Sequence, residues 1–108
     1  MKPLRGATAL VTGAAGHLGA SLTRALLDAG CAVRALVYDG DQGVRGLPIA
    51  RVTGDVCDPA AVRAAVAGVD VVFHLAARIS IEGDPDGRVR RTNVEGTRVV
   101  AEACLDAR

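Results

Sequence analysis

The stretch VTGAAGHLG, residues 11–19, places a glycine at every third position between two apolar segments. The glycines of this stretch are Gly13, Gly16 and Gly19. The segment before them, 7–12, is apolar rather than alternating, which is typical of a fully buried strand. The segment after them, 17–29, has an apolar face at helical spacing and is followed by Gly30 as a stop signal. We assign four residues to that face: Leu18, Leu22, Leu26 and Ala29. The sequence therefore predicts a strand, a tight glycine loop and a helix.

The rest of the chain continues this alternation of strands and helices. Further strands are predicted at 32–38, 49–55 and 70–75. A helix follows Asp58 as N-cap, with Pro59 as its first residue and Gly68 just past its end. A last helix is predicted over about 87–105, with one face made of Val89, Asn93, Gly96, Val100 and Ala103. Residues 39–48 are expected to form a loop with at most one helical turn, and 82–87 another loop. This order predicts an α/β fold with a doubly wound parallel sheet, strand order 3-2-1-4 and helices on both faces.

Composition narrows the class of protein. The 108 residues suffice for one domain with its own core, and the formal net charge is only +1. With one Phe, one Tyr and no Trp, the chain lacks the aromatic platforms on which nucleic-acid bases stack. No run reaches the roughly 18 apolar residues that a membrane helix needs. We therefore expect neither nucleic acid nor a membrane as partner.

Cysteine usage indicates a reducing compartment. Cys31, Cys57 and Cys104 are odd in number, widely spaced and without a CxxC pair. We expect small buried side chains, no disulfide framework, no metal site and a cytoplasmic location. His74 is expected to be a packed strand residue rather than a metal ligand or a base, because no second ligand lies at metal spacing.

The three glycines suit a loop that holds a phosphate group. Gly13 would permit the tight turn out of the strand, Gly16 would let a cofactor approach the backbone, and Gly19 would let the helix pack closely on the sheet. The start of the helix carries unpaired N–H groups and a partial positive charge, which suit the pyrophosphate of a dinucleotide. A glycine-rich turn without a ligand is the alternative reading of the same residues.

Four ordered motifs carry a resemblance to a known family. The loop reads TGxxGxxG, GDVCD spans 54–58, FHLAA spans 73–77 and NVEGT spans 93–97. Together they resemble the extended short-chain dehydrogenase/reductases, the NAD-dependent epimerase/dehydratase group, and within it the dihydroflavonol-4-reductase-like branch. The resemblance covers essentially the whole chain. It implies a partial Rossmann-type domain, 1–108, that binds NAD or NADP.

The resemblance also implies which residues bind the cofactor. The glycines would line the pyrophosphate, Asp55 would accept a hydrogen bond from the adenine amino group beside the Val56 backbone, and Ala76 and Ala77 would pass under the nicotinamide side. Asn93 would brace the helix that carries the active-site wall. The full set of expected cofactor-binding residues is Gly13, Ala15, Gly16, His17, Leu18, Gly19, Tyr38, Asp39, Asp55, Val56, Leu75, Ala76, Ala77 and Asn93. Two alternatives stay open: Asp55 as a turn residue at a strand end, and Asn93 as a helix kink.

The end of the second predicted strand bears on the choice between NAD and NADP. An acid there binds the ribose 2′-OH, and an Arg binds a 2′-phosphate. The reductase-like branch often reads VRALVR, whereas this chain has Tyr38 in place of the last Arg, and Asp39 follows. Asp39 lies one position later than the usual acid, and Arg45 is close enough in sequence to reach the phosphate. We favour NAD.

The catalytic pair of the family is not found in these residues. The resemblance implies a Tyr as general acid/base with a Lys four residues later, but Tyr38 and Lys2 are the only residues of their types. We therefore expect the N-terminal, cofactor-binding part of a reductase or epimerase/dehydratase acting on a carbonyl or hydroxyl of a small molecule, without catalytic residues of its own. The chain would then be truncated, one subunit of a split enzyme or an excised fragment. A stand-alone dinucleotide sensor and a non-functional remnant are the alternatives. The apolar strand VVFHL, 71–75, is expected to be an open edge, able to pair with a complementing C-terminal segment or a second copy.

Overall fold

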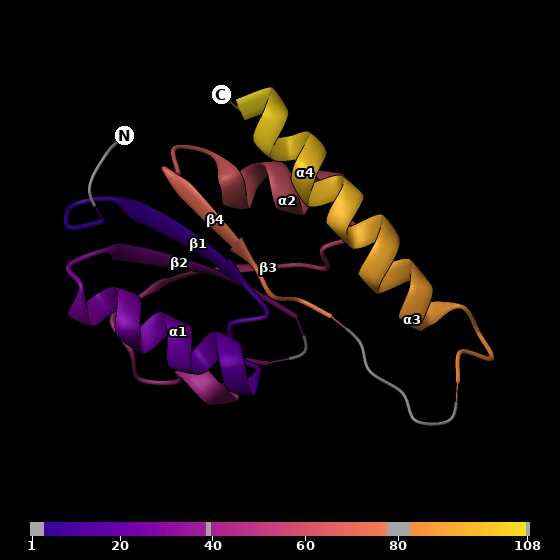
Figure 1. Ribbon diagram of the computed structural model, residues 1–108, viewed down its shortest axis with the longest axis horizontal. Helices are drawn as coiled ribbons and strands as arrows, with labels where there is room; N and C mark the ends of the chain where they lie inside the picture. The colour runs from indigo at the N-terminus through magenta and orange to yellow at the C-terminus, as the bar shows by residue number, and fades with distance from the viewer. Residues whose placement is uncertain (1–3, 39, 78–82, 108) are drawn as a thin grey trace.

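A four-stranded parallel sheet forms the centre of the molecule, with helices on both faces (Figure 1). The computed structural model describes residues 4–38, 40–77 and 83–107. The strands are β1 (Thr8–Thr12), β2 (Ala32–Val37), β3 (Ala50–Thr53) and β4 (Val71–His74). They lie in the order β3-β2-β1-β4, all parallel. The predicted fold class and strand order are confirmed, and each strand is one to three residues shorter than predicted.

The sheet separates two apolar cores, each covered by its own helices. On one face, α1 (His17–Asp28) and the short helix η1 (Gln42–Val44) cover a core that includes Val11 and Val33. On the other face, α2 (Pro59–Val66) and α4 (Gly96–Ala107) cover a core that includes Leu10 and Val62 (Figure 1). Successive residues of β1 face opposite cores, which explains why its three central residues, Ala9, Leu10 and Val11, are all apolar.

The buried face of α1 differs from the one predicted. Gly19, Ala20, Thr23 and Leu26 are its buried residues, whereas Leu18 is 68% exposed and Ala29 is also exposed. The prediction is confirmed for Leu26, which is buried, and for Leu22, which packs against the core, but it was wrong for Leu18 and Ala29. The helix instead lies so close to the chain beneath it that small residues occupy the contact.

The start of α2 matches the prediction closely. The Asp58 carboxylate accepts a hydrogen bond from the Ala60 amide (3.0 Å), and Pro59 is the first helical residue. The carboxyl end of α2 is capped by a residue of the sheet. The Arg34 guanidinium on β2 donates hydrogen bonds to the carbonyl oxygens of Ala65 and Ala67 (2.7 Å each). These bonds satisfy carbonyls that the helix end leaves unpaired.

The last predicted helix is regular only in part. It begins with α3 (Arg88–Arg90), continues as a π-helical turn, η2 (Arg91–Glu95), and becomes α4. The carboxylate of Asp84 caps its start by accepting from the amides of Val89 and Arg90 (3.0 Å each), and these bonds lower the pKa of Asp84. The π-helical turn changes the direction in which the side chains before and after it point.

Two of the four strands lie at the edges of the sheet. β3 is mostly exposed and β4 is half-buried, while β1 is almost fully buried. The strand predicted to be an open edge, 71–75, therefore does lie at an edge of the described sheet, as β4. Among the described residues, no helix is long and apolar enough to cross a membrane.

Candidate functional site

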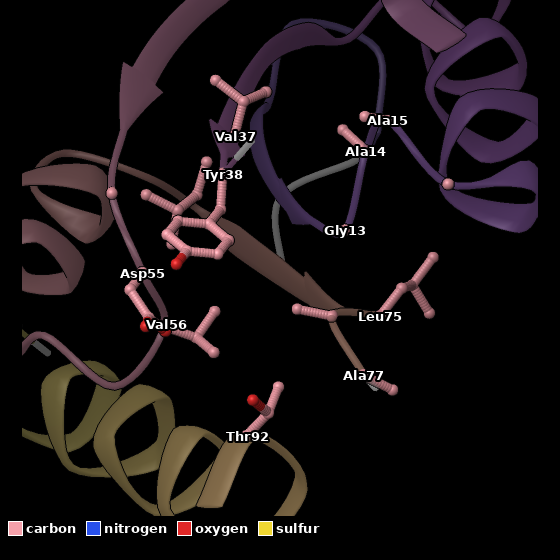
Figure 2. A pocket seen from close by; sticks show the side chains of 14 residues that line it. Gly13, Ala14, Ala15, Val37, Tyr38, Asp55, Val56, Leu75, Ala77 and Thr92 are labelled. Carbon is pink, nitrogen blue, oxygen red and sulfur yellow. The ribbon is translucent and has the colours of Figure 1, made fainter. Parts of the chain in front are cut away.

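A pocket of about 490 Å³ lies at the carboxyl ends of the strands (Figure 2). Strand order reverses at β1, since β2 and β3 follow on one side of it and β4 on the other. In open α/β sheets this switch point is where ligands bind. The pocket is lined by Gly13, Ala14, Ala15, Gly16, Leu36, Val37, Tyr38, Gly54, Asp55, Val56, Leu75, Ala76, Ala77 and Thr92.

The glycine loop forms one wall of the pocket, and an added Cβ would meet different surroundings at each of its three glycines. Gly13 has φ +70°, and a Cβ on it would lie 2.7 Å from the Ala76 nitrogen, so the loop passes directly over the chain after β4. A Cβ on Gly19 would overlap the Gly13 carbonyl oxygen. Gly19 therefore lets α1 approach the loop rather than the strands, which refines the predicted close packing. Gly16 has ordinary extended angles, and a Cβ there would meet only the Gly13 oxygen, at 3.3 Å.

The amino end of α1 opens on this wall. Gly16 precedes the helix without a side-chain cap, and the first turn carries no acidic residue. Within the helix start, the Ala20 amide donates to the Gly16 carbonyl (2.9 Å). The amides before Ala20 come too early in the helix to find an intrahelical acceptor. The positive end of the helix dipole is therefore available to an anion in the pocket.

An aromatic ring and a carboxylate lie at the opposite end of the pocket. Figure 2 shows the ring of Tyr38 next to Asp55, with Val56 beside them. Tyr38 is 60% exposed, whereas Val56 is buried. One oxygen of Asp55 accepts a hydrogen bond from the Cys57 amide (2.9 Å), which fixes the carboxylate in a turn after β3. Asp55 is thus both a turn residue and part of the pocket lining, so the two readings of this residue are compatible.

The chain after β4 forms the pocket floor, which buried Thr12 holds in place. The Thr12 hydroxyl oxygen accepts hydrogen bonds from the amides of Leu75 (3.0 Å) and Ala76 (3.1 Å). The Leu75 amide also points at the Thr12 carbonyl oxygen (3.2 Å). The small side chains of Ala76 and Ala77 leave the floor open.

Three contacts hold η2 and α4 against the pocket. Gly96 lies so close to Val56 that a Cβ on it would come within 2.6 Å of a Val56 methyl group. The Cys57 thiol donates to the Arg91 carbonyl (3.4 Å), and burial followed by the charge of Asp55 raises the pKa of this thiol. The third contact joins Thr97 to His74 on β4 (3.1 Å).

The pocket gathers most, but not all, of the predicted site residues. The predicted residues that line it are Gly13, Ala15, Gly16, Tyr38, Asp55, Val56, Leu75, Ala76 and Ala77. His17 and Leu18 are exposed and Gly19 is buried, and none of these three lines the pocket. Asn93 does not line it either, and its carbonyl accepts a hydrogen bond from the Thr97 hydroxyl (2.7 Å). Asp39 lies outside the described residues. Whether these residues bind a cofactor remains a prediction.

Five lining residues of the pocket were not predicted from the sequence. They are Ala14, Leu36, Val37, Gly54 and Thr92. Gly54 belongs to the quoted GDVCD motif, and Leu36 and Val37 end a predicted strand, so their positions carried a usable signal. No sequence signal marked Thr92, because it lies in the π-helical turn, and a spacing of 3.6 residues per turn does not reveal such a turn.

Comparison with known proteins agrees with this geometry. Residues 10–108 match the 3-beta hydroxysteroid dehydrogenase/isomerase family. Sterol demethylase protein B of Methylococcus capsulatus is 41% identical over 97 residues, which are 88% of this chain and 30% of that protein. Dihydroflavonol 4-reductase of Hordeum vulgare is 32% identical over 109 residues, or 91% of this chain and 31% of that enzyme.

Solved structures extend the agreement to three dimensions. A short-chain dehydrogenase/reductase superfamily protein from Agrobacterium tumefaciens with bound NAD has a TM-score of 0.76 and 35% identity, covering 93% of this chain and 29% of that one. The resemblance drawn from the four motifs is thereby confirmed. The chain spans about 30% of the length of the curated relatives it matches.

Proposed function

The chain belongs to the 3-beta hydroxysteroid dehydrogenase/isomerase family, and we propose that it forms the part of a short-chain reductase or epimerase/dehydratase that binds a nicotinamide dinucleotide. The pocket at the uncapped amino end of α1 carries this proposal. Its volume lies within the usual range of small-molecule sites, about 300–1,000 Å³. The relatives that match include reductases, a dehydrogenase and a dehydratase, which favours this function over a stand-alone sensor.

The two ends of the pocket support one orientation of the dinucleotide. The pyrophosphate would lie at Gly16, where backbone and helix dipole favour negative charge and a side chain is lacking. The adenine end would lie between Tyr38 and Asp55, whose carboxylate would accept from the adenine amino group. The nicotinamide end would lie over Ala76 and Ala77, where the floor is open. His17, Leu18 and Gly19 would contribute through the backbone of the helix start.

We further propose that the cofactor is NAD rather than NADP. Tyr38 offers no charge to a 2′-phosphate. The nearby Arg51 guanidinium donates to Asp41 (2.9 Å) and to the carbonyls of Ile49 and Val44 (3.1 and 2.8 Å). Arg45 also lies against Asp41 (3.6 Å). Both cations are thus partly neutralised by Asp41, and neither lines the pocket.

The proposed reaction needs groups beyond this pocket. When bound, a nicotinamide would donate or accept a hydride, and the substrate would carry a carbonyl or a hydroxyl group. The residues of this chain would bind and orient the cofactor. The Tyr–Lys pair that the family resemblance implies would come from outside these 108 residues, since the one Tyr of the sequence, Tyr38, lies at the end of the pocket that we propose for adenine.

The open edge at β4 supports a further partner. Among the described strands β4 pairs with β1 alone, and a half-buried apolar strand at the edge of a sheet is a template for another strand. We propose that a complementing segment or a second copy of the chain pairs there. The three free cysteines support a location in the reducing cytoplasm.

Gly16→Val tests the pocket while sparing the fold. Its backbone angles suit any residue and an added Cβ would meet only the Gly13 carbonyl oxygen, at 3.3 Å, so a branched side chain is expected chiefly to obstruct the pyrophosphate site. Ala25→Val, on the exposed side of α1, is the matched control. Calorimetry should show NAD binding in the wild type and the control and at least tenfold weaker binding in Gly16→Val. Equal affinity in all three proteins would refute the pyrophosphate assignment, and no binding in any of them would refute the function.

A further inference from the structure

A chain of hydrogen bonds runs from β1 through β4 to α4, beneath the pocket. The Thr12 hydroxyl meets Nδ1 of His74 (2.7 Å), and Nε2 of the same ring meets the Thr97 hydroxyl (3.1 Å). Thr97 in turn donates to the Asn93 carbonyl (2.7 Å). Thr12 and Thr97 lie 85 residues apart in the sequence. The hydrogen bonds between them connect the floor of the pocket to its η2 wall.

The two ends of this chain independently define the tautomer of His74. Thr12 accepts from two amides, so its own proton is left to donate and Nδ1 must accept it. At the other end, Thr97 uses its proton on the Asn93 carbonyl, so its oxygen must accept and Nε2 must carry the ring proton. Both requirements are met by one species, the neutral imidazole protonated at Nε2.

Protonation of His74 would disrupt this arrangement. A second ring proton would point Nδ1–H at the Thr12 oxygen, which already faces two amide donors. Burial lowers the pKa of His74. Among the described elements, β1 and α4 supply the hydrogen-bond partners of the His74 ring, and the partner on β1 is the uncharged Thr12. Beside Thr97, Glu95 and Arg98 are paired with each other (2.7 Å), and Glu102 lies against the same Arg98 (3.7 Å). Burial, not a neighbouring charge, therefore favours the neutral ring.

We propose that His74 is a positioning residue for the dinucleotide: through Thr97 it ties the wall carrying Thr92 to the floor at Leu75 and Ala76. The inference rests on the function proposed above. His74 itself does not line the pocket. Its effect on affinity arises because the dinucleotide must contact the floor and the wall together, and the His74–Thr97 bond fixes their separation. Without that bond, binding would also have to order the wall.

Two substitutions each remove the hydrogen bond between His74 and Thr97, one at each partner. Thr97→Val removes the hydroxyl but keeps the shape. His74→Asn puts a carbonyl oxygen close to the place of Nδ1, so it can still accept from Thr12 while losing Thr97. Each should raise the Kd for NAD by about 3- to 10-fold, the scale of one hydrogen bond. Thr97→Val also removes the bond from Thr97 to the Asn93 carbonyl. The double variant should bind NAD no more weakly than the weaker of the two single variants, because the His74–Thr97 bond is the contact that both substitutions remove. Thr8→Val, at the far end of β1, is the control and should bind like the wild type.

The pH dependence separates positioning from general stabilisation. Nitrogen-15 NMR of the imidazoles should show His74 protonated at Nε2 near pH 7.5, and titration should give its pKa below the usual 6.5. The His17→Gln variant assigns the two rings, since the sequence has two histidines. As pH falls through the measured pKa, the second ring proton should break the bond between Nδ1 and Thr12. The wild-type Kd should therefore rise with falling pH, whereas the Kd of His74→Asn, which has no ring to protonate, should change less. His17 is present in both proteins, so its own titration cancels in the comparison.

The outcomes distinguish this inference from the proposed function. Variants that unfold at lower temperature but bind NAD like the wild type, with the same pH profile, would overturn the positioning role and leave the function standing. A ring protonated at Nδ1 would overturn the hydrogen-bond chain directly. A wild-type protein that binds no NAD would overturn the function, and the positioning role with it.

Discussion

Replacing Gly19 with Ala tests how the glycine loop is built. In an exposed helix this change stabilises by about 1 kcal/mol, because alanine is the better helix former. Here the new Cβ would overlap the Gly13 carbonyl oxygen and lie 2.7 Å from the Gly13 carbonyl carbon and 2.9 Å from the Ala14 Cα. Carbon atoms normally approach no closer than about 3.5 Å. All three obstacles are backbone atoms, so no side-chain rotation relieves them.

The magnitude follows from the competition between these two effects. Overpacking in a well-packed region costs about 1–3 kcal/mol, and a backbone obstacle belongs at the upper end. Set against the gain in helix propensity, Gly19→Ala should destabilise the fold by about 1–2 kcal/mol. With a urea m-value of about 1–3 kcal/mol per molar, the unfolding midpoint should fall by roughly 0.3–2 M. The shifted loop should also weaken NAD binding, because Gly13 and Gly16 line the pocket.

Urea unfolding followed by circular dichroism, with calorimetry for NAD, measures both effects. Ser21→Ala, on the exposed side of α1, is the control that gains helix propensity without an overlap, and its midpoint should stay the same or rise. A Gly19→Ala protein as stable as this control, with unchanged NAD affinity, would show that α1 does not approach the loop as closely as described.

Two further predictions concern cofactor choice and the sheet edge. The wild type should bind NAD more tightly than NADP in calorimetry with both cofactors. The combined substitution Tyr38→Arg and Asp39→Asn should shift this preference toward NADP by about 1–3 kcal/mol. A wild type that already prefers NADP would contradict the assignment. The 108-residue chain should self-associate in light scattering through β4 and show no turnover, whereas adding a segment that carries the Tyr–Lys pair should reduce the association. A stable monomer that reduces the cofactor alone would be the contrary result.

The strand–loop–helix unit was predictable because its signals are local. An apolar run, glycines at fixed spacing and a helical periodicity each act within a few residues, and parallel pairing with right-handed crossovers leaves few topologies for such a chain. The predicted strand order and the Asp58 cap are accordingly confirmed. Most of the pocket lining followed as well, because the carboxyl ends of parallel strands meet at one edge of the sheet.

Three features were decided only by tertiary structure. Leu18 lies exposed although it completes an apolar helical face, because the close approach of α1 to the loop selects small residues for the contact. Thr92 reaches the pocket through a π-helical turn that the α-helical period does not reveal. The protonation state of His74 depends on hydrogen-bond partners on β1 and α4, and no local pattern brings these together. Such contacts form only when the sheet register and the helix packing are complete, so their energies depend on atoms that are distant in sequence and adjacent only in the fold.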